Sequence, residues 1–267
     1  MAETTPSVLA DLPPTLRAEF REPVAVLTLN RPEKRNALSD EVVLGIERFF
    51  AGLPAGIRVV VLAAAGDHFS AGLDLAEMSD RDTIAGITHS RMWHRAFDLV
   101  EYGPVPVVAA LKGAVVGGGL ELAAAAHIRV AERSTFYALP EGQRGIFVGG
   151  GAAVRVPRLI GVSRMTDLML TGRRYDAAEG AAMGLSHYVV DDGAGLDQAL
   201  DLAGRIAQNA PQTNFAVVQA LPRIAEANPR EGYLMEAMMA AITQGTDDAK
   251  ARMQAFLDGR APKVTDL

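Results

Sequence analysis

Three short apolar runs in the first half of the chain have the character of β-strands. The β-rich run 24–29 ends just before Pro32, and proline stops a strand because it has no N–H for the ladder. Runs 58–63 and 106–111 are almost continuously apolar, which is typical of strands buried on both faces. The pattern therefore predicts a sheet that is covered on both sides.

Helical patterns separate these runs. Ser39 or Asp40 is expected to cap a helix, because a short polar side chain there precedes apolar residues at helical spacing. A second helix is expected over 84–102, and the glycine run 117–119 opens a short alanine-rich one. With the brief strand-like runs that follow, a strand–strand–helix unit recurs without visible sequence repeats, and the class is α/β.

The pattern becomes helical near the C-terminus. Helices are expected near 211–226 and 230–258, both rich in Ala, Leu and Met. An apolar face on the second must be covered by the core or by a neighbouring copy of the chain. That face comprises Leu234, Met235, Met238, Met239 and Ile242.

Three regions follow from this organisation: a flexible arm at 1–14, a core at 15–192 and a C-terminal helical trimerisation region at 193–267. The arm lacks the basic and apolar segments of a signal peptide. Residues 107–119 are the most apolar stretch, but Lys112 and four glycines interrupt it, so a membrane span is not expected. A soluble cytoplasmic protein is the expectation.

The composition excludes several classes of binding partner and of chemistry. The 267 residues are 49% apolar, enough for a substantial core. The formal charge is −6, so the chain has no general attraction for nucleic acid or anionic membranes. The sequence contains no cysteine, which excludes disulfides, thiolate catalysis and Cys-based zinc sites. His89 and His94 are five residues apart rather than four, so no metal site is expected from them.

The glycine run 117–119 leaves the backbone without side chains at the start of a predicted helix. Amides there can face a developing oxyanion, and one such donor is typically worth roughly 3–4 kcal/mol. Tight helix–strand packing is the alternative interpretation of the three glycines. A dinucleotide fingerprint fails because Leu122 stands where glycine or alanine belongs, and a phosphate loop fails because no Gly-Lys-Ser/Thr follows.

Two glutamates accompany this backbone. Glu121 falls in the first helical turn, where the helix dipole favours the ionised form, and Glu141 follows Pro140 at a strand end. If both face one apolar cleft, repulsion leaves one protonated, which suggests Glu121 as base and Glu141 as acid. Arg144 nearby could reverse this assignment. Two ordinary surface glutamates are the alternative.

The combined motifs resemble the enoyl-CoA hydratase/isomerase (crotonase) family. The chain has Phe69-Ser70-Ala71-Gly72-Leu73-Asp74-Leu75, then Gly117-Gly118-Gly119-Leu120-Glu121, then Pro140-Glu141 and a glycine cluster at 149–151. The resemblance covers about residues 15–260. It implies a crotonase-type spiral of repeated ββα turns with a C-terminal helical region, assembled as a trimer or a dimer of trimers. Val148 stands where the family often has proline.

The resemblance also implies roles for individual residues. The amides of Leu73 and Gly118 match the oxyanion hole, and Glu121 and Glu141 match the hydratase glutamates. Positions matching the coenzyme A (CoA) site are Lys34, Arg35, Ala37, Ala71, Asp74 and Leu75, although Lys34 and Arg35 also read as ordinary surface charges.

The implied activity is syn addition of water to a trans-2-enoyl-CoA, giving a 3-hydroxyacyl-CoA, with no cofactor or metal beyond the CoA of the substrate. The alternatives are isomerase, decarboxylase or hydrolase chemistry within the family, or a non-catalytic acyl-CoA-binding protein. Ser70 is expected to be structural, because no nucleophile elbow surrounds it. Met78, Met92 and Trp93 are expected in the core, with an acyl pocket as the alternative.

Overall fold

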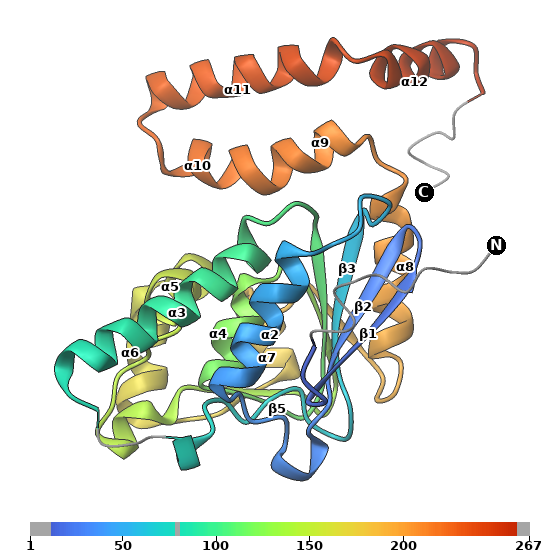
Figure 1. Cartoon of the computed structure of the whole chain (residues 1–267). Helices are drawn as coiled ribbons and strands as arrows, with labels where there is room; N and C mark the ends of the chain where they lie inside the picture. Colours follow the sequence, from blue (N-terminus) through green and yellow to red (C-terminus); the bar gives the residue numbers. More distant parts are fainter. Residues whose placement is uncertain (1–11, 78–80, 261–267) are drawn as a thin grey trace. The chain divides into compact units, whose positions relative to one another are not determined.

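The computed structural model describes residues 12–77 and 81–260, and the chain divides into two compact units after Arg205. The predicted boundary at residue 192 precedes helix α8 (Gly195–Ala207), whose first residue donates an amide hydrogen bond to Glu132 of the first unit. The predicted arm at 1–14 falls mostly outside the described residues. Figure 1 follows the chain through both units.

The first unit is built on a six-stranded sheet. β1 runs antiparallel to β2, and every other neighbouring pair is parallel. All residues of the strands Val59–Ala64 and Val107–Leu111 are buried, as their continuous apolar sequence predicts. The spatial order is β1 (Leu16–Arg21), β2 (Val24–Leu29), β3 (Val59–Ala64), β4 (Val107–Leu111), β6 (Ile128–Glu132) and β9 (Tyr188–Val190).

A second, three-stranded sheet follows the first along the chain. It consists of β5 (Ala114–Val116), β7 (Phe136–Ala138) and β8 (Tyr175–Asp176). β5 comes directly after β4, and β7 comes directly after β6, so successive turns place one strand in each sheet. An isolated bridge between Ser70 and Val115 extends this arrangement to the segment after β3. This is the repeated ββα spiral.

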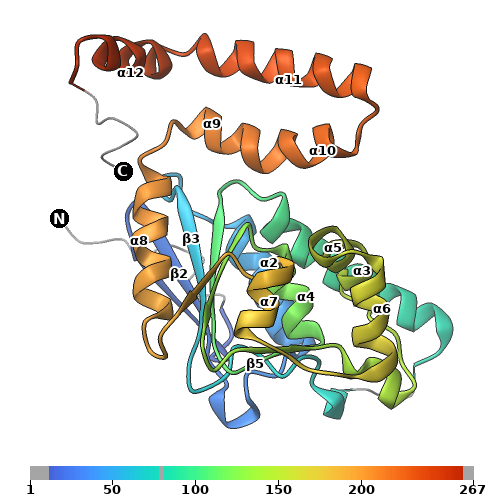
Figure 2. The ribbon, with the colours of Figure 1, turned by 180° about the vertical axis from the view of Figure 1, so that it is seen from behind.

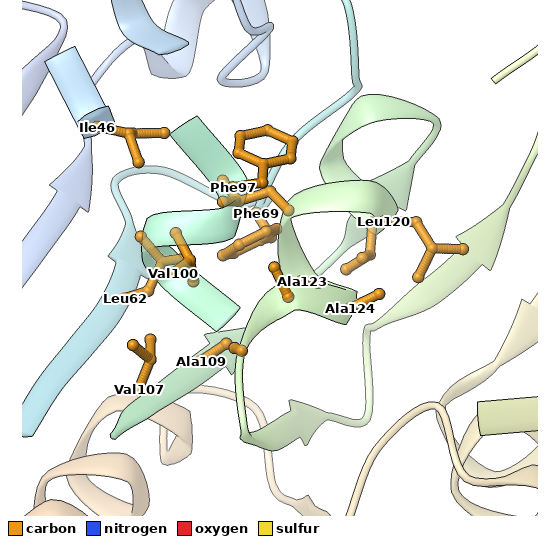
Figure 3. Packing of buried hydrophobic residues seen from close by; sticks show 14 of the residues in the cluster. Ile46, Leu62, Phe69, Phe97, Val100, Val107, Ala109, Leu120, Ala123 and Ala124 are labelled. Carbon is orange, nitrogen blue, oxygen red and sulfur yellow. The ribbon is translucent and has the colours of Figure 1, made fainter. Parts of the chain in front are cut away.

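Helices cover both faces of the large sheet. Figures 1 and 2 show α2 (Asp40–Ala51), α3 (Thr83–Glu101) and α4 (Gly118–Ala125) on one face and α8 on the other. Side chains from α3, α4 and β3 interlock in the core between them, as Figure 3 shows for Phe97, Ala123 and Leu62. The remaining helices of this unit are α5 (Ala152–Ile160), α6 (Val162–Thr171) and α7 (Ala177–Met183).

The second unit is helical. The helix expected near 211–226 is a continuous run of α9 (Pro211–Phe215), a π-helical segment (Ala216–Ala220) and α10 (Leu221–Glu226). The helix expected at 230–258 is two helices, α11 (Pro229–Gln244) and α12 (Asp247–Leu257), because Thr246 starts a new helix by accepting the N–H of Ala249 on its hydroxyl. Within the described residues, no helix has the length and apolar character needed to cross a membrane.

Candidate active site

Two glycine-containing turns pack directly against each other. Gly72 has φ +91°, and a Cβ on it would lie 2.7 Å from the carbonyl oxygen of Val116 and 3.0 Å from the nitrogen of Gly118. A side chain at position 72 would therefore push the turns apart. A Cβ on Gly118 would lie 3.3 Å from the nitrogen of Leu73, so the two backbone amides are neighbours.

The amides of Leu73 and Gly118 are available to a ligand. Leu38 accepts the N–H of Asp74 and donates its own N–H to Gly72, which turns the N–H of Leu73 to the opposite side. Gly118 begins α4, where N–H groups have no partner within the helix. Neither amide has a hydrogen-bond acceptor within the described part of the chain, and both residues line a cavity.

A buried network holds the first turn in place. Asn36, in the left-handed region at φ 53°, donates its side-chain amide to the carbonyls of Ala65 and His68 at 2.8 and 2.7 Å. Ser70 Oγ donates to the carbonyl of Asn36 at 2.8 Å and accepts the N–H of Gly72 at 3.1 Å. The predicted structural role of Ser70 is confirmed, because its hydroxyl is fully used in supporting this turn.

Glu121 lies in the first turn of α4, as predicted, and is 4% exposed. Its Oε1 accepts the backbone N–H of Gly150 at 2.8 Å and of Ala152 at 3.1 Å. Burial raises the pKa of Glu121, and the amides and the charge of Arg155 offset only part of that effect. The two amides leave Oε2 as the oxygen available for a substrate molecule.

Glu141 approaches the same cavity from the other sheet. The N–H of Gly117 donates to the carbonyl of Ala138, the last residue of β7. The chain then continues into the short 3₁₀ helix Pro140–Arg144, which contains Glu141. A Cβ on Gly117 would lie 2.7 Å from Glu141 Oε1. Burial and the nearby charge of Glu121 raise the pKa of Glu141 to about 7. Its Oε2 is buried without a hydrogen-bond partner among the described residues.

These groups share one cavity of about 270 Å³. Leu73, Gly118, Glu121 and Glu141 all line it, so the structure brings the four predicted catalytic positions together. The remaining wall comes from Arg81, from α3 and from the segment before α5, including His89, Ser90, Trp93, Phe147 and Val148.

The three residues considered for an acyl pocket have different surroundings. Trp93 belongs to the core, with 3% exposure, and also lines the cavity. Met92 lines an adjoining pocket instead, and Met78 lies outside the described residues. His89 lines both pockets and contacts Asp40 at 2.6 Å.

The residues predicted to contact CoA come from two segments that pair with each other. Ala71 donates its N–H to the carbonyl of Arg35, and the Leu38–Leu73 bridge continues the pairing beside Ala37. Lys34, Arg35 and Leu75 are exposed.

Asp74 is engaged within the protein. Its Oδ2 accepts from Arg31 at 2.7 Å, and its Oδ1 accepts the N–H of Ala76. Burial would raise the pKa of Asp74, but the Ala76 amide and the Arg31 guanidinium outweigh burial and lower it. Arg31 was not among the predicted site residues, although it directly precedes Pro32, the residue predicted to stop the strand 24–29.

The amides that support Glu121 were not predicted. Gly150 belongs to the glycine cluster 149–151 and Ala152 directly follows it, but neither was assigned a role. Their amides serve a carboxylate some 30 positions earlier in the chain, and no local pattern indicates that pairing. In the described ranges, no group of three or more histidine or acidic side chains is arranged to hold a metal ion.

The family model described as "Enoyl-CoA hydratase/isomerase" matches residues 19–266. The chain belongs to this family. The enoyl-CoA hydratase EchA19 of Mycobacterium tuberculosis is 32% identical over 93% of this chain and 96% of that protein. A crystal structure of a proposed enoyl-CoA hydratase from Rhodopseudomonas palustris is 59% identical, with a TM-score of 0.90 over 92% of this chain and 95% of that one.

A further solved relative in this enoyl-CoA hydratase/isomerase family is a proposed enoyl-CoA hydratase from Thermobifida fusca in complex with CoA. It is 26% identical, with a TM-score of 0.81 over 90% of this chain and 95% of that one. The predicted crotonase fold is thereby confirmed. The paired glycine turns and the two buried glutamates are thus features of a crotonase-family enzyme.

Proposed function

We propose that the protein is an enoyl-CoA hydratase, which adds water reversibly and in syn fashion to a trans-2-enoyl-CoA to give a 3-hydroxyacyl-CoA. The observation that carries the proposal is one cavity lined by two buried glutamates and two backbone amides without acceptors in the described chain. The names of the relatives support an acyl-CoA substrate, and a fold neighbour was solved with CoA.

The amides of Leu73 and Gly118 would hold the thioester carbonyl oxygen. When water adds to C3, negative charge moves through C2 onto this oxygen, and preorganised N–H donors stabilise it. The paired segments 34–38 and 71–75 would then hold the CoA portion, with Lys34 and Arg35 near its phosphates. The proposed reaction uses no cofactor beyond the CoA of the substrate.

Glu121 would act as the base and Glu141 as the acid. Burial raises the pKa of Glu121, but two amides on Oε1 and the charge of Arg155 work against that rise and stabilise the carboxylate, whose Oε2 can take a proton from water. Glu141 has a pKa of about 7 and so carries a proton in a large fraction of molecules at neutral pH. That proton goes to C2 as the hydroxyl oxygen bonds to C3, which completes the addition with atoms and charge balanced.

Hydration is favoured over double-bond migration because both carboxylates line the cavity. An isomerase needs one base that moves a proton between carbons, whereas hydration needs water deprotonated and carbon protonated together. Isomerase, decarboxylase and hydrolase reactions are the alternatives within the family, and a silent acyl-CoA-binding protein is the alternative outside catalysis.

The test is incubation of 2-enoyl-CoA and 3-enoyl-CoA substrates, aliphatic and aromatic, in ¹⁸O-labelled water. Label at the 3-hydroxyl of the product is the expected result. Rapid migration of the double bond from position 3 to position 2, without label, would assign the protein as an isomerase. Binding of the esters without any turnover across the panel would favour the silent binding protein.

A further inference from the structure

Arg155 connects the surroundings of Glu121 to α3, a helix that lies far from α5 in the sequence. Arg155 itself lies in α5 with 6% exposure, and each of its three guanidinium nitrogens donates a hydrogen bond. Nη1 donates to the carbonyl of Gly150 at 3.0 Å, Nη2 pairs with Asp98 at 2.8 Å, and Nε pairs with Glu101. Because both carboxylates belong to α3, the guanidinium ties the glycine turn before α5 to that helix.

The turn at residues 149–151 is shaped to receive this guanidinium. Gly151 has φ +113°, and a Cβ on it would lie 2.1 Å from Nη1 of Arg155. A Cβ on Gly150 would lie 2.6 Å from Oε2 of Glu121. Because Gly150 and Gly151 have no side chains, the turn fits between the carboxylate of Glu121 and the guanidinium of Arg155.

The same turn supplies the amides that hold Glu121. Gly150 donates its N–H to Oε1 of Glu121 while its carbonyl accepts from Arg155. A shift of the guanidinium would rotate this backbone and turn the amide away from the carboxylate. The positive charge of Arg155 also lowers the pKa of Glu121 against the effect of burial.

We propose that Arg155 is a positioning residue for Glu121: it fixes the glycine turn so that the amides hold one carboxylate oxygen and leave the other for the attacking water. The inference rests on the proposed role of Glu121 as base. The other ionisable groups facing this pair are Glu141 and, from α3, His94, Asp98 and Glu101.

The test compares Arg155→Gln and Arg155→Lys with the control Arg158→Gln. Arg158 lies on the same helix and pairs with the same Glu101 at 3.7 Å, but its side chain is 45% exposed. Arg155→Gln should lower kcat by up to roughly 10²-fold with KM nearly unchanged, because misplaced catalytic groups affect the chemical step. It should also move the acid limb of the kcat profile to higher pH.

Arg155→Lys keeps the charge but loses the planar fork, so the acid limb should stay near its wild-type position while kcat remains low. This variant decides the question if Arg155→Gln fails to fold. The control should keep both kcat and the acid limb. A folded Arg155→Lys enzyme with wild-type kcat would overturn the proposal.

A titration of Glu121 by ¹³C NMR separates this inference from the proposed function. It needs no turnover, and the pKa of Glu121 should rise in Arg155→Gln, or in Arg155→Ala if only that variant folds. If the wild type fails to hydrate enoyl-CoA, the hydratase proposal is lost, and a raised pKa still supports the link between Arg155 and Glu121. An unchanged pKa together with unchanged kcat would eliminate the link.

Discussion

Glu121 and Glu141 line one cavity but differ in their hydrogen bonds: Oε1 of Glu121 accepts two backbone amides, whereas Oε2 of Glu141 is buried without a partner in the described chain. A buried carboxylate oxygen without a donor is costly when charged, so proton binding relieves that cost at Glu141. This difference in surroundings supports the opposite roles proposed for two chemically identical side chains.

Replacing either glutamate by glutamine should abolish most hydration. Glu121→Gln and Glu141→Gln each keep the volume of the side chain but remove its proton chemistry, so kcat should fall by roughly 10²–10⁴-fold. Binding of a CoA ester, measured by calorimetry, should stay close to wild type. Full hydratase activity in Glu141→Gln would show that the acid has been misassigned.

The stability of the protein should depend on pH through Glu141. Its pKa is raised from 4.5 to about 7 in the folded state, so the folded protein binds this proton more tightly than the unfolded chain. The resulting stabilisation is fully present below pH 4.5 and is lost as the pH rises through about 7.

Urea unfolding at pH 5 and pH 8 measures this effect. Glu141→Gln stays neutral at every pH, so the wild type should lose stability relative to this variant between the two conditions. Glu22→Gln, at an exposed position, is the control for the general response of the protein to pH. An equal change in wild type and Glu141→Gln would mean that Glu141 titrates normally.

Gly72→Ala should close the oxyanion site. The new methyl group would lie 2.7 Å from the carbonyl of Val116 and would separate the amides of Leu73 and Gly118. Gly193→Ala is a matched control, because Gly193 also has positive φ, at +87°, but faces open space. Both should lose about 1–2 kcal/mol from backbone strain, and Gly72→Ala should additionally lose most of its kcat. Equal kcat in the two variants would argue against the proposed oxyanion pair.

Much of the fold was predictable because buried strands and buried helix faces appear in the sequence as apolar runs or as apolar residues at helical spacing. The run 24–29 coincides with β2, and Ser39 caps α2 by accepting the N–H of Val42. β1 was missed although its residues alternate between apolar and polar, as in a half-buried strand, and it pairs antiparallel with β2. The short strands β5 and β8 were missed because two or three residues carry no periodic signal.

The candidate site was predictable where its parts lie in motifs. Glu121 and Glu141 stand beside glycine or proline, and their chemistry is local to those turns. Other parts of the site are held by residues that lie far apart in the chain: Arg31 pairs with Asp74 over 43 positions, and Arg155 pairs with Asp98 over 57. Such pairs depend on the packing of the spiral, and local patterns in a single sequence do not reveal them.

The C-terminal helices should assemble the protein into a homotrimer. Leu234, Met238 and Ile242 recur at four-residue spacing on α11, and they are 64%, 54% and 54% exposed. An apolar stripe of this size favours burial against another copy of the chain, at about 25 cal/mol per Å² removed from water. Light scattering should therefore give a trimer mass, or twice that mass for a dimer of trimers.

Met238→Glu places a charge within this stripe and should shift the mass toward the monomer at low concentration. Gln208→Glu adds the same charge at an exposed polar position and should leave the assembly intact. A monomer mass for the wild type that does not change with concentration would rule out the assembly. The apolar residues of α11 would then need another explanation, because solvent exposure of such a stripe carries a free-energy cost with no compensating contact.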